Sequence, residues 1–120
     1  ASCNPKKEKI LSHLTFPLEV LHWHRDRIIL PLQAKLLASS ERCREQFFRI
    51  GPMAYGLQCH IETDKFMVDQ WIKEDIEFIA NGLGLMAKDR LKKQEDMFSN
   101  KSRKSRLKLI FGLMKILTEV

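Results

Sequence analysis

The sequence predicts an α/β fold in which a β-rich N-terminal part is followed by C-terminal helices. Short apolar runs separated by proline and glycine fill the first half, and such runs are typical of strands. In the second half, apolar residues recur at helical spacing with charged residues between them. With 120 residues, 44% of them hydrophobic, the chain is one domain or less with an ordinary core.

The β-rich part is expected to contain several short extended segments. Phe16-Pro17 excludes a helix at that point, because proline disfavours helical geometry in the residue before it. The last two runs are joined by Gly51-Pro52, which indicates a hairpin and a largely antiparallel sheet. The expected extended segments are residues 18–24, 27–30, 35–39, 45–50 and 53–60.

An amphipathic helix is expected directly after these strands. Thr63 is a suitable N-terminal cap, and Asp64 would then lie in the first turn, where the helix dipole favours a negative charge. Asn81-Gly82 is a suitable end. The apolar stripe that should pack on the sheet consists of Val68, Ile72, Ile76 and Ile79.

The positive charge of the chain is concentrated near its C-terminus. Residues 88–108 hold nine Lys or Arg against three Asp or Glu, a surplus of six that equals the net charge of +6 for the whole chain. We expect this basic segment to be a solvated loop before a final helix that buries Leu109, Leu113, Ile116 and Leu117. A membrane-surface helix and a nucleic-acid arm are open alternatives.

His60 and Glu62 are candidate catalytic residues. Residues i and i+2 of a strand project from the same face, so His60 and Glu62 should point together and Cys59 should point away. A carboxylate beside an imidazole holds one tautomer and stabilises the imidazolium, which a general base serving a Cys or Ser nucleophile requires. A structural histidine bonded to a nearby acid is the alternative.

The surroundings of this pair resemble the C-terminal half of class I glutamine amidotransferase domains. In that family the last block usually has the sequence Gly-(Val/Leu)-Gln-Phe-His-Pro-Glu, and here residues 56–62 are Gly-Leu-Gln-Cys-His-Ile-Glu. The resemblance extends from about residue 10 to residue 71. The separated blocks that carry it are residues 20–26, 30–31, 36–40, 46–51 and 55–62.

This resemblance implies a partial flavodoxin-like amidotransferase domain. Residues 1–120 would form one incomplete domain, with a β-rich catalytic-half segment over 10–62 and a helical segment over 63–120. A complete enzyme of the family hydrolyses the side-chain amide of glutamine with a Cys-His-Glu triad and releases ammonia. By resemblance, His60 is the general base and Glu62 orients it, and no cofactor is implied.

The resemblance also implies a glutamine-binding segment at the end of the first predicted strand and just after it. Its candidate residues are Trp23, His24, Arg25 and Asp26. Arg25 stands where the family commonly has glycine, and a long side chain hinders the close approach of a backbone to a ligand.

The family pattern requires a Gly-x-Cys-x-Gly nucleophile elbow, which this sequence lacks. Cys3 lies in a turn-like segment and Cys59 faces away from His60, so neither is a suitable nucleophile. Cys43 has two arginine neighbours that could lower its thiol pKa, which leaves a reactive surface cysteine open. We therefore expect the chain alone to be inactive. Because it begins at Ala1 and not at methionine, a preceding segment that carries the nucleophile is also open.

The histidines and cysteines also bear on metal binding and on the cellular compartment. His22, His24 and His60 could supply three ligands to zinc, but the resemblance places no metal there and we expect none. The three cysteines match no zinc or disulfide framework, and no secretory or membrane-spanning run is present, which favours the cytoplasm.

The competing function is a non-catalytic interaction module. In that case the basic C-terminal helix would bind a protein partner, nucleic acid or an anionic membrane. A half-sheet also leaves backbone groups uncovered at its edge, so we expect a homo-oligomer or a second chain to cover it.

Overall fold

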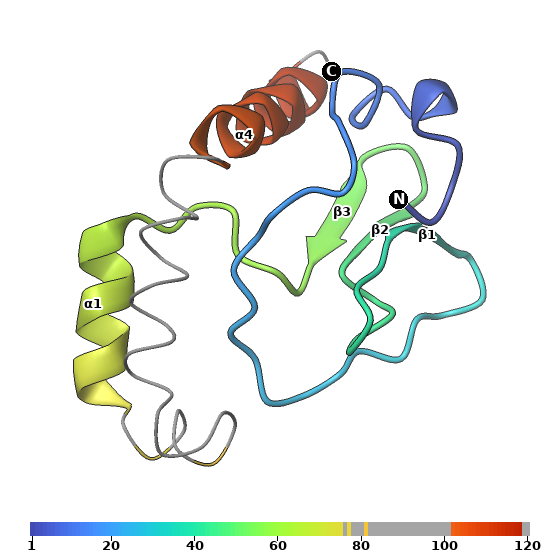
Figure 1. Cartoon of the computed structure of the whole chain (residues 1–120). Coiled ribbons are helices and arrows are strands. Elements are labelled where there is room, and N and C mark those ends of the chain that lie inside the picture. Colours follow the sequence, from blue (N-terminus) through green and yellow to red (C-terminus); the bar gives the residue numbers. More distant parts are fainter. Residues whose placement is uncertain (76, 78–80, 82–101, 119–120) are drawn as a thin grey trace.

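Three antiparallel strands lie at the centre of the fold, and α-helices lie beside them (Figure 1). The computed structural model describes residues 1–75, 77, 81 and 102–118. A short 3-10 helix, Pro5–Lys7, precedes the sheet. The elements that follow are β1 (Ala34–Ala38), β2 (Phe47–Ile50), β3 (Ala54–Leu57), α1 (Lys65–Glu74) and α4 (Arg103–Thr118). This mixed fold confirms the predicted α/β class, with the strands before the helices.

The hairpin between β2 and β3 forms where the sequence predicts it. Ile50 pairs with Ala54, and the turn between them contains Gly51, whose φ of 61° lies in the left-handed region that glycine adopts without strain. β1 pairs with the other side of β2, so that the strand order is β1-β2-β3. The register of this pair shifts at Leu37, which is completely buried. The expected antiparallel sheet is thus confirmed.

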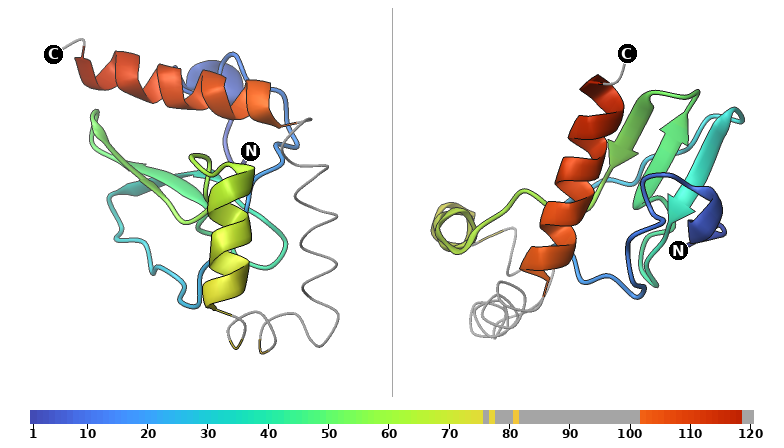
Figure 2. Two further views of the ribbon diagram at one scale, coloured as in Figure 1. Left: turned by 90° about the vertical axis from the view of Figure 1, so that its left-hand side faces the viewer. Right: turned by 90° about the horizontal axis from the view of Figure 1, so that it is seen from above.

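α4 covers one face of this sheet (Figure 2). Leu109 and Ile116 are buried as predicted and Leu113 is half-buried, but Leu117 is exposed. The helix starts at Arg103, so the basic residues from there to Lys108 belong to the helix and not to a solvated loop. The cause is the long-range packing of this turn against the sheet end, described below. Residues 88–101 of the basic segment lie outside the described residues.

The main core lies between α4, the N-terminal segment and the sheet. Ile10 and Leu11 of the N-terminal segment pack on the same side as α4. The buried residues of this cluster are Ile10, Leu11, Leu37, Phe47, Cys59, Ile61, Leu109 and Ile116. Within the described ranges, no helix combines the length and the apolar character that a membrane span needs.

α1 begins and ends differently from the prediction. The cap is Asp64, whose carboxylate accepts a hydrogen bond from Met67 N at 2.8 Å, whereas Thr63 is buried. The helix ends at Glu74, because the backbone of Asp75 leaves helical geometry (φ −126°, ψ 54°). Its last two residues, Lys73 and Glu74, are exposed. The predicted end at Asn81-Gly82 is therefore wrong, and Ile76 and Ile79 lie outside the described residues.

The strands predicted over residues 18–24 and 27–30 do not form. In the first segment, only Leu21 makes a bridge, by exchanging two backbone hydrogen bonds with His60. Leu18 and Val20 are half-buried against the main core. The alternation of apolar and polar residues thus reflects the packing of an irregular segment. Burial of alternate side chains does not by itself create the backbone hydrogen bonds of a strand.

Candidate functional site

His60 and Glu62 lie next to each other at the end of the sheet. His60 Nδ1 is 2.7 Å from Glu62 Oε1, and Ile61 N donates to Glu62 Oε2 at 3.0 Å. Partial burial opposes ionisation of Glu62, but the hydrogen bonds from His60 and the backbone outweigh it and lower the pKa of the carboxyl. The pair is not held by a strand pleat as predicted, because β3 ends at Leu57. A turn beyond the strand brings the two side chains together.

The second nitrogen of His60 is also occupied. Nε2 lies 3.1 Å from the backbone oxygen of Trp23. A carbonyl oxygen only accepts hydrogen bonds, so Nε2 must carry a proton in this arrangement. The carboxylate of Glu62 at Nδ1 and the Trp23 carbonyl at Nε2 are both hydrogen-bond acceptors, so each ring nitrogen of His60 faces an acceptor. A thiol can therefore reach a basic nitrogen of His60 only after the bond to Trp23 is broken.

Two tryptophans position the ring of His60. Its edge faces Trp71 of α1, with ring centroids 5.2 Å apart, and Trp71 in turn lies 5.6 Å from Trp23. Val68 and Ile72 of α1 are buried against the segment that contains Trp23. The helix after the His-x-Glu motif thus forms one wall of the site. Its apolar stripe was predicted to pack on the sheet, but Val68 and Ile72 pack instead on the irregular segment with Leu21 and Trp23.

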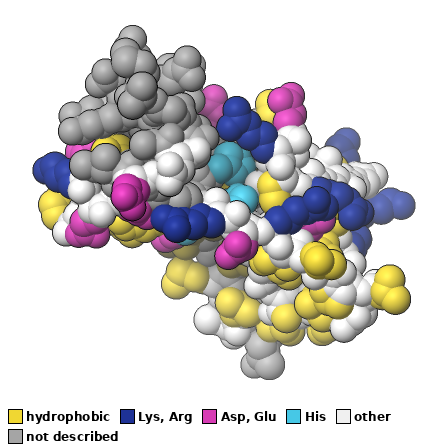
Figure 3. All heavy atoms as spheres, turned by 90° about the horizontal axis from the view of Figure 1, so that it is seen from below, with side chains coloured by type: hydrophobic (Ala, Val, Ile, Leu, Met, Phe, Trp, Pro, Cys, Tyr) yellow, Lys and Arg dark blue, Asp and Glu magenta, His cyan; other side chains and the backbone are white. Residues whose placement is uncertain are grey.

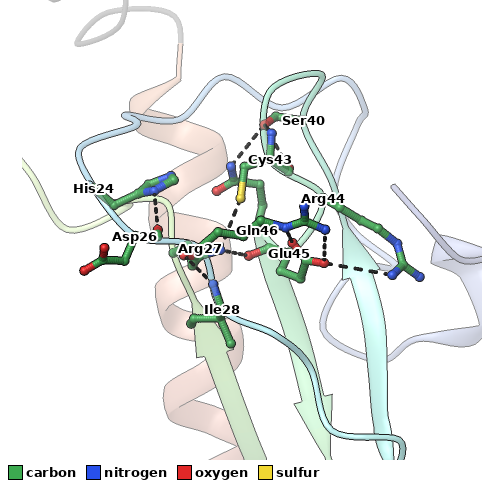
Figure 4. Close-up of polar contacts among 10 residues, drawn as sticks. His24, Asp26, Arg27, Ile28, Ser40, Cys43, Arg44, Glu45 and Gln46 are labelled. Carbon is green, nitrogen blue, oxygen red and sulfur yellow. Dashed lines mark hydrogen bonds and ion pairs between the residues drawn. The ribbon is translucent and has the colours of Figure 1, made fainter. Parts of the chain in front are cut away.

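The predicted substrate-binding residues do not converge on His60. His24 Nδ1 pairs with the backbone oxygen of Asp26 at 3.0 Å (Figure 4), and the Asp26 side chain is exposed. Arg25 extends toward α1, where its guanidinium is 3.6 Å from Asp75. Trp23 contributes its ring and carbonyl to the surroundings of His60, as described above. Of the four candidates, Trp23 is the one that contacts His60.

A network of hydrogen bonds joins the loop that contains Arg27 and Ile28 to the buried residues Glu45 and Gln58, next to the sheet. The sequence analysis did not predict this network. Arg27 makes two hydrogen bonds to the buried Glu45, at 2.6 and 2.9 Å, which lower the pKa of that carboxyl (Figure 4). The Gln58 amide accepts from Ile28 N at 3.3 Å and donates to Glu45 O at 2.7 Å. Gln58 belongs to the sequence block that ends in His60 and Glu62, and its place in that block could have identified it as part of the site. Nothing in the sequence pairs Arg27 with Glu45.

The three cysteines are placed away from His60. Cys43 is buried and accepts a hydrogen bond from Gln58, so the alternative of a reactive surface cysteine is wrong. The Gln58 amide packs against Cys43 and shields its thiol from solvent. Cys59 faces the core, where its Sγ is 3.8 Å from Gln46 O, and burial raises the pKa of this thiol to about 11. Burial also raises the pKa of Cys3, near Leu37.

The three-histidine zinc site does not form. His22 and His24 approach each other edge to face with ring centroids 6.4 Å apart. Within the described part of the chain, no group of three His, Cys, Asp or Glu residues could hold a metal ion. Figure 3 shows histidine side chains at the surface among Lys, Arg and acidic side chains.

Two known proteins are similar to this chain, one in sequence and one in structure. The sequence matches none of the profiles of known protein families. It is 36% identical over 78 residues to the glutamine amidotransferase-like protein YfeJ of Salmonella typhimurium, a match that covers 65% of this chain and 33% of YfeJ. The crystal structure of SMU.1228c superimposes with a TM-score of 0.70 and 28% identity over 95% of this chain and 47% of that one. The chain thus spans about a third and about half of these two proteins. By sequence it is thus similar to part of a glutamine amidotransferase-like protein.

Proposed function

We propose that this chain is the C-terminal part of a class I glutamine amidotransferase, whose complete form hydrolyses the side-chain amide of glutamine and releases ammonia. The observation that carries the proposal is the 2.7 Å contact between His60 Nδ1 and Glu62 Oε1. It occurs in the sequence block that resembles the family motif, in a chain related to YfeJ. The nucleophile is a cysteine supplied by polypeptide outside this sequence.

In this mechanism His60 moves protons and Glu62 holds it in place. The thiolate attacks the amide carbon, and the tetrahedral intermediate collapses as His60 Nε2 donates its proton to the departing nitrogen, releasing ammonia and leaving a thioester. His60 then takes a proton from water, whose oxygen attacks the thioester to give glutamate and the free thiolate. Throughout, Glu62 accepts from Nδ1 and stabilises the imidazolium.

The bond from His60 Nε2 to Trp23 defines what the complete enzyme must change. The Trp23 carbonyl occupies the direction from which a thiol would approach this nitrogen. In the complete domain, the thiol therefore takes the place of the Trp23 carbonyl at Nε2. The chain alone is inactive for two reasons: it lacks a suitable thiol, and its base is already hydrogen-bonded.

Ammonia release tests the proposal. The purified chain should release no ammonia from glutamine above the background of buffer. A longer protein that contains this chain and a preceding Gly-x-Cys-x-Gly segment should release it, and the Cys→Ser variant of that segment should not. Ammonia release by the chain alone, abolished by His60→Ala, would contradict the assignment of the nucleophile to a separate segment.

A second candidate function is a non-catalytic interaction module, and α4 favours it. This helix contains no acidic residue over 103–118, and it exposes Leu107, Phe111 and Met114 beside Lys104 and Lys108. Such a surface suits a partner that is both apolar and anionic, and an uncovered sheet edge suits a second copy.

Binding at two salt concentrations tests this alternative. The chain should bind anionic vesicles or duplex DNA at low salt and lose affinity steeply at high salt, since charge drives the contact. Phe111→Ala should weaken binding to vesicles and leave binding to DNA unchanged. A monomer in light scattering that binds neither probe at low salt would exclude these nucleic-acid, membrane and homo-oligomer forms.

A further inference from the structure

A buried arginine of α4 reaches the segment that carries Glu62. Arg106 is only 6% exposed, although it belongs to the most basic part of the sequence. Its Nη1 donates to the backbone oxygen of Thr63 and, at 3.4 Å, to that of Ile61. Its Nε donates to Ser102 Oγ at 3.1 Å, one helical turn earlier. The guanidinium thus lies between the first turn of α4 and the end of the sheet.

The two carbonyls that Arg106 binds belong to the residues on either side of Glu62. The Ile61 carbonyl belongs to the peptide unit that enters Glu62, and the Thr63 carbonyl to the unit that follows Thr63, so the two bonds fix the backbone before and after Glu62. Glu62 is half-exposed and would otherwise be free to turn toward water. In the observed orientation, one carboxylate oxygen faces His60 and the other accepts from Ile61 N.

Burying the charged side chain of Arg106 costs free energy, and packing of the helix alone does not require it. Transfer of a guanidinium out of water is unfavourable, and its hydrogen bonds must offset that cost. Burial, together with the nearby Arg103, lowers the pKa of Arg106. Other basic residues of α4, such as Lys104 and Lys108, remain exposed. The planar guanidinium can bind two carbonyls at once, which the single ammonium of lysine does less well.

We propose that Arg106 is a positioning residue, which holds the backbone around Glu62 so that its carboxylate faces His60. The inference rests on the proposed function only in the role that it gives to the His60–Glu62 pair. Arg106 acts on the backbone through the carbonyls of Ile61 and Thr63, and its charge also attracts the Glu62 carboxylate.

The proposal can be tested on the chain itself by nuclear magnetic resonance. The Nδ1–H proton of His60 is the direct report on its bond to Glu62, and its resonance is assigned by its absence from His60→Gln. In Glu62→Gln, the exchange of this proton with water should accelerate strongly. Arg106→Gln should accelerate it by roughly tenfold or more, the amount that corresponds to loss of a charge-assisted hydrogen bond. Arg106→Lys should restore part of the protection.

The controls separate positioning from general stability. Lys104→Gln removes an exposed charge from the same turn of α4 and should leave the exchange rate unchanged. The backbone amide spectrum reports whether each variant is folded. If Arg106→Gln is folded and His60 exchange is unaltered, the proposal is overturned. If Arg106→Gln does not fold, Ser102→Ala takes its place, because it removes the contact to Nε alone; a smaller acceleration supports the proposal and an unchanged rate overturns it.

This experiment and the ammonia assay fail independently. A longer protein that carries the cysteine segment but releases no ammonia would remove the proposed function, while accelerated His60 exchange in Arg106→Gln would still establish the coupling. An active longer protein with unchanged exchange in a folded Arg106→Gln chain would retain the function and remove the role of Arg106.

Discussion

Replacing His60 with alanine in the longer, cysteine-containing protein is expected to lower kcat for glutamine hydrolysis by on the order of 10⁴-fold. The variant loses the group that protonates the departing nitrogen and activates water, and no other described residue is placed to do so. His60 makes the 2.7 Å contact to Glu62, and its position just after β3 is held by the bridge to Leu21. Steady-state ammonia release, measured with a coupled assay, gives kcat and KM separately.

Two further variants give this prediction its controls. Glu62→Gln keeps the shape of the side chain but removes the charge that stabilises the imidazolium, so kcat should fall by less than in His60→Ala and KM should change little. His13→Ala removes an exposed histidine that is distant from His60 in the sequence, and it should leave kcat unchanged. Equal activity of His60→Ala and the parent protein would show that the pair is structural.

Leu37→Ala is expected to lower the free energy of unfolding by about 2–5 kcal/mol. Leu37 is 0% exposed and lies at the register shift between β1 and β2, where the main core meets the sheet. Its removal leaves a cavity that β1 cannot close without breaking its pairing to β2. Urea unfolding followed by circular dichroism measures the loss.

Leu32→Ala is the matched control for this variant, because it makes the same chemical change at a completely exposed side chain (105%) in the loop before β1. It should change the free energy of unfolding by no more than about 0.5 kcal/mol. Similar losses in the two variants would mean that the core described for this chain is not the one that forms in solution.

Features that depend on neighbouring residues were predictable from the sequence. The hairpin of β2 and β3 follows from two apolar runs joined by Gly51, and the turn needs the positive φ that glycine provides. The start of α1 was predicted to within two residues of Lys65, although Asp64 and not Thr63 caps it. Such elements form from contacts only a few residues apart.

Features that depend on distant contacts were not predictable in this way. The segment 18–24 has the alternation of a strand, but only Leu21 finds a backbone partner. The basic segment was expected to be solvated, yet Arg106 is buried because it meets carbonyls 43 and 45 residues earlier in the chain. Neither the charge of a residue nor its periodicity indicates such a partner.

By itself, the sequence predicted that His60 and Glu62 would point together, since they are two residues apart, although a turn beyond β3 and not a strand pleat joins them. It also placed them in a block that resembles the amidotransferase motif. Only the tertiary structure decided which atoms surround the pair. The Trp23 carbonyl at Nε2 and the Arg106 guanidinium behind Glu62 come from distant parts of the chain, and packing of the sheet and helices brings them together.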